Sequence, residues 1–515
     1  MIYDGHAYAF PDLGGDGGFA DPEQFRRHLQ LGMARHFMPA WRKKDRTPAD
    51  DLGLADPDGG WSFDALNDVD FRAATHGTFE WTVDGEVYVK QYMVPSVVDM
   101  TYPAESLVAE MDYAGVDMAL IHRTPYLGIS NEFIADCTSR FPDRLQGLAH
   151  VEEWLVPTDP RGSYEKLRKA VAEPGMVGLQ FLPDQIPLYD QPEDWTWKEF
   201  WPFWDGVAEL GIPVFITPSY KSLATEGGTA AEVVASQLRA VGTLMDRYTD
   251  MDVVVTHGLS WRIFVDGDTL SIPDEVFDAM PSERPRFSLQ LLFAISLGDI
   301  WEYPMPQVRP TMKRLVDRLG ADRLMWGTDI PMVMRFYTYR QNLAHIRHVS
   351  DFLTPDEVGL ITGGNIARLL GVEGKNRVAN MTNEERERLK KFLAPSRIAV
   401  VATVGKTGMP QLTPNWYDFA DDRITISTTK DRIKYLNLVR DDRLAVCVYS
   451  DTLAHEYVTV RGHAEIVDGD AIWPDTLAIV KRYVTPDKVE ARMSALRKQP
   501  RIIISLEPDQ VHFNG

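Results

Sequence analysis

Along the first two thirds of the chain, hydrophobic and polar positions follow two periods in turn. Short apolar runs, typical of buried strands, alternate with longer segments in which apolar residues recur every three or four positions, as on one face of a helix. The strand-like runs are Met1–Tyr3, Val116–His122, Leu145–Val151, Met176–Leu182, Ile212–Thr217, Val253–His257, Phe287–Phe293 and Leu324–Asp329, and helical patterns cover 105–115, 131–140, 195–210, 230–248 and 311–319. Strands that alternate with helices predict a parallel sheet, and eight of them predict an α/β fold of the (β/α)8 TIM-barrel type.

Residues from about 12 to 103 interrupt this alternation. Within them, residues 78–92 alternate apolar and polar on either side of Asp84-Gly85, which predicts a β-hairpin. The connection is longer than two neighbouring barrel strands need, so we interpret it as an insertion. Such an insertion is either a lid over the barrel mouth or a subdomain without a catalytic role, and the pattern leaves both open.

After residue 373 the pattern changes. Residues 374–380 predict a linker, and Thr382 with Glu385 forms a T-x-x-E capping box before a short helix. Strand-like runs follow at 398–404, 411–419, 424–429, 444–449 and 457–467, with turns at 405–408 and 420–423. Closely spaced strands with one helix after the third predict a small antiparallel β-barrel over residues 381–515, which follows a first domain of residues 1–373.

The composition narrows the setting in which the protein works. No apolar run approaches the about 18 residues of a membrane span, and the N-terminus lacks the basic stretch of a secretion signal. The only cysteines are Cys137 and Cys447, too few and too far apart for a disulfide framework or a zinc ribbon. We therefore expect a cytoplasmic protein.

The charge is unevenly distributed. Residues 381–515 hold 20 of the 54 Lys and Arg and 19 of the 75 Asp and Glu, so the first 380 residues carry a net charge of −22. An acidic surface disfavours nucleic acid and anionic membranes, because both bind positive patches. We expect a small-molecule substrate, with neither nucleic acid nor a membrane as partner.

Polar residues stand at the ends of most predicted strands, where barrels of this type keep their active sites. They are His6, His122, His150, Gln180, Thr217, His257, Gln290 and Asp329. His6 and Asp329 end the first and eighth strands, which become neighbours when the barrel closes, and His257 ends the sixth, across the mouth. Neutral imidazoles and a carboxylate that converge in this way are typical of a divalent-metal site, beside which a histidine can act as general acid or base.

Each of these residues alone has a more ordinary explanation, as an exposed histidine or a carboxylate that caps a helix. Their shared position at strand ends favours the functional interpretation. We interpret His122, His150 and Glu152 as structural groups, because buried polar groups at such positions usually have hydrogen-bond partners.

At these residues the chain resembles the amidohydrolase-related superfamily, in the branch of aminocarboxymuconate-semialdehyde decarboxylase and related decarboxylases, hydratases and lactonases. The resemblance covers about residues 1–373 and rests on the segments DGHAY, EMDYAGVDMALI, RFPDRLQGLAHV, ELGIPVFITPS, VVVTHG, LMWGTDIP and GGNIARLLGV. It implies that His6 is the first metal histidine, that Asp329 is the carboxylate ligand and catalytic, and that His257 transfers protons beside the metal.

Two positions depart from this family pattern. Tyr8 replaces the second histidine of the D-x-H-x-H motif, and Thr217 replaces the histidine ligand on the fifth strand. A zinc or manganese ion would then be held by His6, Asp329 and substitutes, or the barrel works without a metal. Tyr8 is a candidate catalytic residue as an acid, an electrophile or a hydrogen-bond donor.

A second group of functional residues lies in the segment ITISTTKDRIKYLNL, residues 424–438. A strand leads into a turn and the start of a helix, and the residues that suit an anion there are Thr428, Thr429, Lys430, Arg432 and Lys434. Hydroxyls, a helix N-terminus and three cations within seven residues predict a phosphate site, although a charge run alone is more often a solvated turn.

Residues 381–515 resemble the pyridoxamine-phosphate-oxidase-like split barrels, which bind flavin mononucleotide or a deazaflavin coenzyme. The matching segments are RIAVVATVGKTGMPQLTPNWY, ITISTTKDRIKYLNL, YVTVRGHAEIV and RIIISLEP. The resemblance implies that Lys430, Arg432 and Lys434 hold the cofactor phosphate, with Thr428 and Thr429 beside it. It also implies a homodimer, because the cofactor sites of this family lie between two subunits.

The resulting hypothesis is a two-part enzyme. An amidohydrolase-like barrel hydrolyses or non-oxidatively decarboxylates a small carboxylated or cyclic substrate, and the appended split barrel binds a flavin-type cofactor for a coupled redox step. One alternative is a flavin- or deazaflavin-dependent oxidoreductase in which a metal-poor barrel only binds substrate. The other is a non-catalytic dimeric scaffold.

Overall fold

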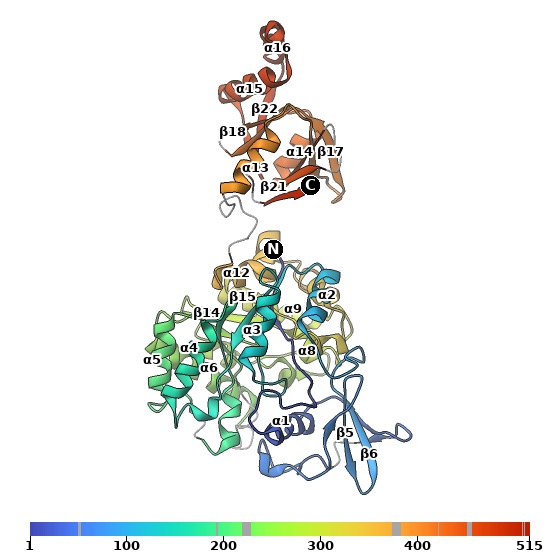
Figure 1. Cartoon of the computed structure of the whole chain (residues 1–515), viewed down its shortest axis with the longest axis vertical. Coiled ribbons are helices and arrows are strands. Elements are labelled where there is room, and N and C mark those ends of the chain that lie inside the picture. Colours follow the sequence, from blue (N-terminus) through green and yellow to red (C-terminus); the bar gives the residue numbers. More distant parts are fainter. Residues whose placement is uncertain are drawn as a thin grey trace. The chain divides into compact units, whose positions relative to one another are not determined.

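The computed structural model describes residues 1–49, 53–191, 194–218, 228–372, 383–420, 422–450, 456–506, 508 and 510–514. The chain separates into two compact units, Met1–Gly371 and Val372–Gly515 (Figure 1). The predicted linker, residues 374–380, and the capping residue Thr382 lie outside the described residues. No helix of the described residues is both long and apolar enough to cross a bilayer.

The first unit is built on eight parallel strands in the order β1-β7-β8-β9-β10-β11-β14-β15. Their bounds are β1 Tyr3–Ala7, β7 Met118–Ile121, β8 Leu145–Ala149, β9 Met176–Phe181, β10 Val214–Ile216, β11 Val253–Val255, β14 Phe287–Leu291 and β15 Leu324–Trp326. Each strand overlaps one of the predicted apolar runs or, for β1, begins at its end. This confirms the predicted TIM-type barrel.

The barrel is nearly closed between its first and last strands. Ala7 forms a parallel bridge with Ile330, and the N–H of Tyr8 donates to the carbonyl of Ile330 at 2.9 Å. Gly5 permits this approach, because a Cβ at its position would lie 2.9 Å from the carbonyl oxygen of Trp326. The seam therefore brings the residues that end β1 and β15 to the same edge.

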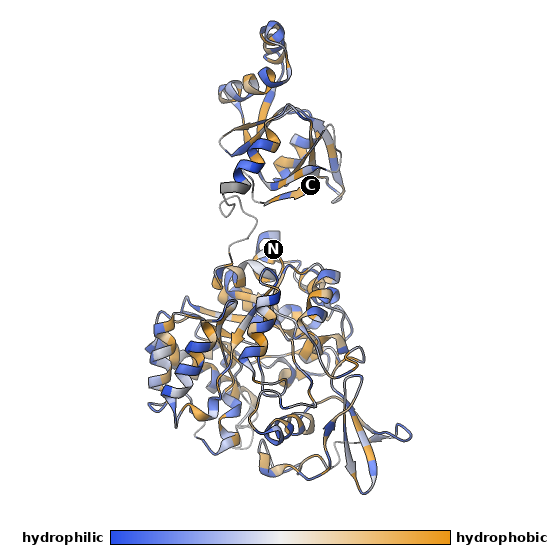
Figure 2. Ribbon diagram, viewed as in Figure 1, coloured by the Kyte–Doolittle hydropathy of each residue, from blue (hydrophilic) through white to orange (hydrophobic). Residues whose placement is uncertain are grey.

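Helices surround the strands and carry both hydrophobic and hydrophilic residues (Figure 2). They are α2 Ala104–Ala114, α3 Asn131–Arg140, α4 Pro160–Val171, α5 Trp201–Leu210, α6 Ala230–Arg247, α7 Asp274–Ala279, α8 Phe293–Leu297, α9 Arg309–Leu319, α10 Tyr339–Val349, α11 Pro355–Gly359 and α12 Asn365–Leu369. Helix α5 begins six residues later than the predicted 195–210. Pro202 explains this start, because a residue without an N–H suits the first turn of a helix.

The segment between β1 and β7 is a subdomain with its own small sheet, visible in blue in Figure 1. Its elements are α1 Pro22–Ala34, β2 Ala40–Arg42, β3 Pro48–Ala49, β4 Arg72–Ala73, β5 Thr78–Val83 and β6 Glu86–Gln91, with the sheet order β3-β2-β6-β5-β4. The hairpin β5–β6 is as predicted, and its turn residues Asp84 and Gly85 both have positive φ, as a two-residue turn requires. A further short hairpin joins β12 Val265–Asp266 to β13 Thr269–Leu270.

The second unit is a curled antiparallel sheet in the order β17-β16-β20-β21-β22-β19-β18, with β23 paired to β21. The strands are β16 Ala399–Val404, β17 Pro410–Asn415, β18 Asp418–Ala420, β19 Arg423–Thr429, β20 Arg443–Tyr449, β21 Tyr457–Val467, β22 Arg501–Leu506 and β23 Gln510–Asn514. The helices are α13 Asn383–Leu393, α14 Ile433–Arg440, α15 Trp473–Tyr483 and α16 Val489–Leu496. The structure agrees with the predicted small antiparallel barrel, except that the single run 411–419 is divided into β17 and β18.

Candidate active site

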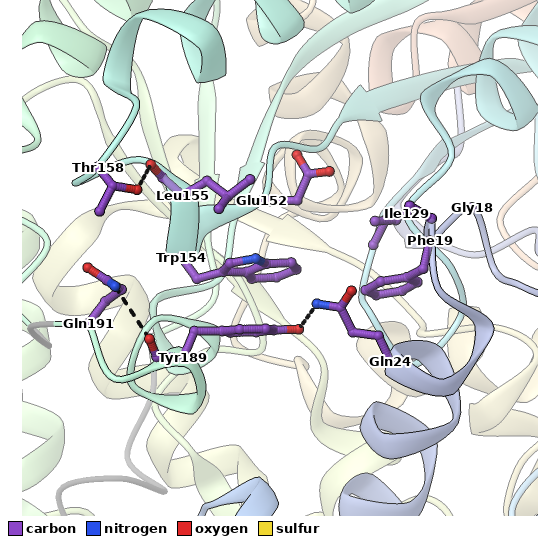
Figure 3. A pocket seen from close by; sticks show the side chains of 11 residues that line it. Gly18, Phe19, Gln24, Ile129, Glu152, Trp154, Leu155, Thr158, Tyr189 and Gln191 are labelled. Carbon is purple, nitrogen blue, oxygen red and sulfur yellow. Dashed lines mark hydrogen bonds between the residues drawn. The ribbon is translucent and has the colours of Figure 1, made fainter.

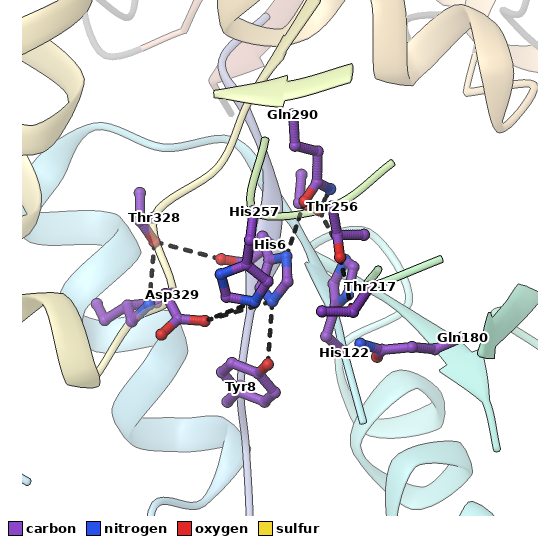
Figure 4. Close-up of polar contacts among 12 residues, drawn as sticks. His6, Tyr8, His122, Gln180, Thr217, Thr256, His257, Gln290, Thr328 and Asp329 are labelled. Carbon is purple, nitrogen blue, oxygen red and sulfur yellow. Dashed lines mark hydrogen bonds and ion pairs between the residues drawn. The ribbon is translucent and has the colours of Figure 1, made fainter. Parts of the chain in front are cut away.

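Three side chains of metal-ligand type converge at the ends of β1, β11 and β15 (Figure 4). His6 Nε2 lies 3.4 Å from Asp329 Oδ1, and His257 Nε2 lies 3.8 Å from the same oxygen. All three ligand atoms lie within 4.8 Å of one another. His6 is fully buried and Asp329 nearly so, while the His257 side chain is 29% exposed, which leaves the cluster open on one side.

The backbone aims two of these side chains by an uncommon conformation. Asp329 has φ of 66° and His257 has φ of 56°, both in the left-handed region. The N–H of Asp329 donates to the carbonyl of His6 at 2.8 Å, which holds the loop after β15 against the end of β1. Because non-glycine residues rarely adopt positive φ, this strain is consistent with a functional role.

Gln290, at the penultimate position of β14, sets the tautomer of His6. Its Nε2 donates to the carbonyl of Gly5 at 2.7 Å, so its Oε1 is left to accept from His6 Nδ1, 2.8 Å away. His6 therefore carries its proton on Nδ1 and presents the lone pair of Nε2 to Asp329. Burial lowers the pKa of His6 well below its usual range, which keeps the ring neutral, as a metal ligand must be.

His122 and Asp4 support this arrangement from outside the cluster. The His122 ring stacks on His6 with centroids 3.6 Å apart, and its Nε2 lies 2.8 Å from the carbonyl of Gly5. Asp4 accepts from the hydroxyl of Tyr339 at 2.8 Å and from the backbone N–H of His6 at 3.0 Å. The structural role that we predicted for His122 thus has a geometric basis, since it braces the ring of His6.

Tyr8 and Thr217, the two departures from the family pattern, differ in position. The Tyr8 hydroxyl lies 3.0 Å from His6 Nε2, and burial keeps the tyrosine protonated by raising its pKa. The Thr217 hydroxyl instead hydrogen-bonds Thr256 at 2.6 Å. Tyr8 therefore contacts the cluster, whereas the Thr217 hydroxyl is engaged with Thr256.

Asp329 has an oxygen that suits a cation. No donor is placed to hydrogen-bond Oδ1, although it is buried, among the residues that the structure describes. Burial raises the pKa of Asp329 to about 7, an effect that the charge of Arg335 partly offsets. A buried carboxylate oxygen with two histidine nitrogens in front of it is the environment that a bound cation would complete.

A cavity of about 200 Å³ lies over the cluster. Its described lining consists of Tyr8, Tyr92, Thr124, Tyr126, Leu127, Gln180, Leu182, Asp184, Thr217, Pro218, Thr256, His257, Gly258, Ser260, Asp329 and Met332. Tyr92 comes from the insertion, and its carbonyl accepts from Arg335 at 3.0 Å. The insertion thus supplies part of the cavity wall, which supports the lid interpretation over the non-catalytic one.

A second and larger cavity, of about 520 Å³, lies between the start of α1 and the loop after β8 (Figure 3). Trp154 and Tyr189 stack in it with ring centroids 4.3 Å apart. Glu152, also in its lining, pairs with Lys166 at 2.6 Å. None of the three cluster residues is among the side chains that line this cavity.

His150 is not the satisfied structural group that the sequence suggested. Both of its ring nitrogens are buried without a hydrogen-bond partner among the described residues, and Nδ1 lies 3.8 Å from Glu153 Oε1. Glu153 Oε1 accepts from the N–H of Leu182 at 2.9 Å, while Oε2 has no partner in the described chain. Glu152 and Glu153 are adjacent, and nothing in the sequence indicates that Glu153 is the buried one of the two.

Glu153 predicts a pH dependence of stability. Burial raises its pKa well above the usual value of about 4.3. The folded chain therefore keeps a proton that the unfolded chain has lost, and the free energy of unfolding falls as the pH rises above about 4.3, by up to about 1.4 kcal/mol per pH unit. In Glu153→Gln this fall is expected to be absent.

Thermal unfolding at pH 5 and pH 8 measures this difference. The matched control is Glu152→Gln, since that carboxylate is partly exposed and paired with Lys166. Equal pH slopes in wild type and Glu153→Gln would contradict a buried, protonated Glu153.

In the second unit, the five residues of the predicted phosphate site are only partly assembled. Lys434 is buried and its Nζ contacts Asn415 Oδ1 at 2.5 Å, and Thr428 is buried on β19. Lys430 instead pairs with Asp468, and the Thr429 hydroxyl donates to Asp431. Their locations are β19 for Thr428 and Thr429, the turn for Lys430 and Arg432, and the first turn of α14 for Lys434.

Arg501 joins this turn from the neighbouring strand. It opens β22 directly opposite Thr429, and its Nε donates to the Ser427 hydroxyl at 3.0 Å. Burial, and after it the charges of Arg432 and Arg501, lower the pKa of Lys434. Sequence reasoning missed Arg501, because nothing local identifies the strand that pairs with β19.

A parallel barrel with two histidines and a carboxylate around a small cavity at its strand ends has the architecture of a barrel enzyme with a metal centre. Residues 74–372 match the family model described as amidohydrolase, and residues 386–515 match that described as pyridoxamine 5'-phosphate oxidase. The chain belongs to the amidohydrolase family, and its second part matches the pyridoxamine 5'-phosphate oxidase model. Both resemblances inferred from the sequence are thereby confirmed.

Among curated proteins, the chain is similar to the gamma-resorcylate decarboxylase of Polaromonas sp. strain JS666, with 28% identity over 231 residues. The match covers 39% of this chain and 64% of that relative's length. Among solved structures, it resembles a dihydroxybenzoic acid decarboxylase from Polaromonas sp. JS666 with bound manganese and 2-nitroresorcinol (18% identity, 55% of this chain, 89% of that one, TM-score 0.39). The second unit resembles an F420 reductase (25% identity, 24% of this chain, 94% of that one, TM-score 0.20).

The cluster geometry fits a divalent ion. Three ligand atoms placed tetrahedrally about 2.1 Å from an ion are about 3.4 Å apart. The observed separations of 3.4 and 3.8 Å are close to this value, and the third is within 4.8 Å. His6, His257 and Asp329 thus form a candidate three-ligand metal site in which other coordination positions stay open for substrate.

Proposed function

We propose that the barrel catalyses metal-dependent, non-oxidative decarboxylation of a small carboxylated ring compound. The observation that carries this proposal is the convergence of His6, His257 and Asp329, whose ligand atoms lie within 4.8 Å of one another, beside a small cavity that His257 and Asp329 line. The likeness to a gamma-resorcylate decarboxylase supports decarboxylation over the hydrolysis that other barrels of this type perform. Hydrolysis of a cyclic substrate is the competing outcome.

The charge of the cavity lining suits a bound metal ion. None of its described lining residues is Lys or Arg, whereas Asp184 and Asp329 are both carboxylic acids. The charges of Arg335 and Arg123 already act on Asp329 and Tyr8 of this lining, and a metal ion would add to their attraction for a substrate carboxylate. Zinc or manganese, held by His6, His257 and Asp329, would supply Lewis-acid polarisation of the substrate oxygens.

The reaction exchanges carbon dioxide for a proton. In R–COO⁻ + H⁺ → R–H + CO2, the electrons of the broken C–C bond form the new C–H bond. With His257 committed to the ion, Tyr8 is the proton-bearing group of the cluster, because burial keeps its hydroxyl protonated. The cavity contacts solvent beside the partly exposed His257, so Tyr8 can regain its proton after product release.

Incubation of the purified chain with single-ring hydroxybenzoates in D2O tests this function. The proposal predicts release of CO2 and one deuterium at the vacated ring carbon. A product that retains its carboxylate and gains the elements of water would instead establish a hydrolase. The cavity of about 200 Å³ favours one ring over two.

Gln290→Leu is expected to weaken metal binding about 10- to 100-fold, the usual cost of removing a group that orients a histidine ligand. Without the Gln290 acceptor, His6 is no longer held as the Nδ1–H tautomer. Isothermal titration with zinc and manganese measures the change. Gln30→Leu is the control, since Gln30 is a buried glutamine that bonds the carbonyls of Leu54 and Asn67 in the insertion. Equal losses in both variants would contradict the role of Gln290.

For the second unit we propose binding of flavin mononucleotide or a deazaflavin coenzyme, which would supply hydride or electron transfer for a coupled step. The buried Lys434, whose Nζ contacts the amide oxygen of Asn415 and whose pKa the charges of Arg432 and Arg501 lower, supports an anionic ligand there. The same domain suits the alternative of a flavin- or deazaflavin-dependent oxidoreductase. A purified protein that is yellow and contains no metal would favour that alternative. A scaffold would show neither metal nor cofactor.

We propose a homodimer through the second unit. Ile433, Leu436 and Val439, spaced three residues apart on α14, and Leu412 on β17 are apolar and 55–63% exposed, as residues of an interface between subunits are in one subunit alone. Leu436→Asp is expected to convert a dimer to a monomer in light scattering coupled to gel filtration. Val98→Asp is the control, since Val98 is an exposed apolar residue of the first unit. A wild-type chain that is monomeric at micromolar concentration would overturn the proposal.

A further inference from the structure

The larger cavity of the first unit, of about 520 Å³, has the properties of a second small-molecule site. Its volume falls within the about 300–1,000 Å³ of typical ligand pockets. Its walls are the loops that follow β1, β7, β8 and β9, together with the start of α1 in the insertion. The strand-end side of the barrel therefore holds two cavities, which share no residue of their described linings.

Aromatic and aliphatic side chains form the apolar part of this cavity. Trp154 and Tyr189 stack, and the Phe19 ring is parallel to that of Trp154 to within 2°, with centroids 6.5 Å apart (Figure 3). Leu155, next to Trp154 in the lining, is 45% exposed. Such a wall is typical of sites that bind a ring compound.

The polar side chains of the lining offer more acceptors than donors. Gln24 Nε2 donates to the Tyr189 hydroxyl at 2.5 Å, and Gln191 Nε2 donates to the Tyr189 carbonyl at 3.4 Å (Figure 3). The Thr158 hydroxyl donates to the carbonyl of Leu155 at 3.1 Å. These bonds leave the amide oxygens of Gln24 and Gln191 as acceptors, so a ligand that fits them carries N–H or O–H groups.

Glu152 adds a negative charge to this lining. Its Oε1 pairs with Lys166 at 2.6 Å, whereas no side chain of the described residues hydrogen-bonds its Oε2. Because a carboxylate has about four acceptor positions, the pair with Lys166 leaves room for a further donor. None of the described lining residues is Lys or Arg, and the first 380 residues carry a net charge of −22. The cavity therefore favours a cation over an anion.

We propose that this cavity binds a small organic cation in which an apolar ring carries an amine or amidine group. The ring lies against the apolar wall, and the N–H groups donate to Glu152 Oε2 and to the amide oxygens of Gln24 and Gln191. The ligand then contacts the insertion through Gln24 and the barrel through Glu152. The proposal does not depend on the metal centre, because the two cavities have separate linings.

Calorimetric titration of the full chain with benzamidine and with benzamide tests this site, because the two planar compounds have nearly the same shape and only the amidine is a cation near neutral pH. Wild type is expected to bind benzamidine at least about tenfold more tightly, the worth of one charge-assisted hydrogen bond. Glu152→Gln is expected to remove this preference. Gln24→Leu, which removes an acceptor without changing the charge, is expected to weaken binding of both compounds.

Glu165→Gln is the matched control, since Glu165 is an exposed glutamate that pairs with Arg168 and lies outside the lining. An unchanged unfolding temperature shows that each variant is folded. Equal affinity of wild type for benzamidine and benzamide, or equal effects of Glu152→Gln and Glu165→Gln, would overturn the proposal. Loss of benzamidine binding in Asp329→Asn together with full binding in Glu152→Gln would also overturn it, because the amidine would then occupy the smaller cavity.

Discussion

Asp329→Asn is expected to abolish turnover by the barrel and to weaken metal binding more than 100-fold. This loss is larger than the about 10- to 100-fold that follows when a group that orients a ligand is removed. Asp329 Oδ1 is the one oxygen among the three ligand atoms, and both histidine nitrogens face it at 3.4 and 3.8 Å. Asparagine keeps the shape but loses the charge, so an ion would lose its only anionic protein ligand.

The metal content of the purified variant and its rate of CO2 release measure this effect. Asp184→Asn is the matched control, because Asp184 lines the same cavity but lies outside the cluster. Asp184→Asn should retain the ion. Wild-type metal content in Asp329→Asn would exclude Asp329 as a ligand.

Tyr8→Phe is expected to lower kcat by about 10²- to 10⁴-fold, the usual contribution of a positioned acid or base, and to leave the metal content unchanged. The Tyr8 hydroxyl lies 3.0 Å from His6 Nε2, next to the proposed ion but outside the ligand set. Tyr8 stands where the family pattern has a histidine ligand. Because its hydroxyl lies outside the proposed ligand set, Tyr8→Phe tests proton donation separately from metal binding.

Single-turnover measurement of the C–H bond-forming step in D2O tests this role. The control is Tyr126→Phe, since Tyr126 lines the same cavity and contacts Gln185 at 3.3 Å. Its kcat should stay near that of wild type. If Tyr8→Phe lost the metal instead, Tyr8 would be a ligand substitute and the proton donor would lie elsewhere.

Much of the fold was predictable because local patterns agree with it. The apolar runs of the barrel strands are buried on both faces, so they stand out as continuous segments, and the Asp84-Gly85 turn marks its hairpin by conformational preference alone. The start of α5 was not predicted. The Trp-rich segment before Pro202 forms turns, but its hydrophobic pattern is similar to that of a helix.

The site was predictable to the extent that it follows from strand order. His6 and Asp329 meet because the first and last strands of a barrel are neighbours. The position of His257, 3.8 Å from Asp329, suits a third ligand as well as the proton-transfer role that the resemblance implied, and it depends on a loop with positive φ. Tyr92 and Arg501 could not be found, since the insertion and a distant strand bring them in without a local signal.

The measurement that most directly tests the proposed metal centre is elemental analysis of the chain purified without chelators, in wild type and in His257→Gln. We expect about one zinc or manganese per wild-type chain and a large loss in His257→Gln, because metal retention requires all three ligands. Wild-type chain without metal that still releases CO2, or full metal content in His257→Gln, would contradict a three-ligand site formed by His6, His257 and Asp329.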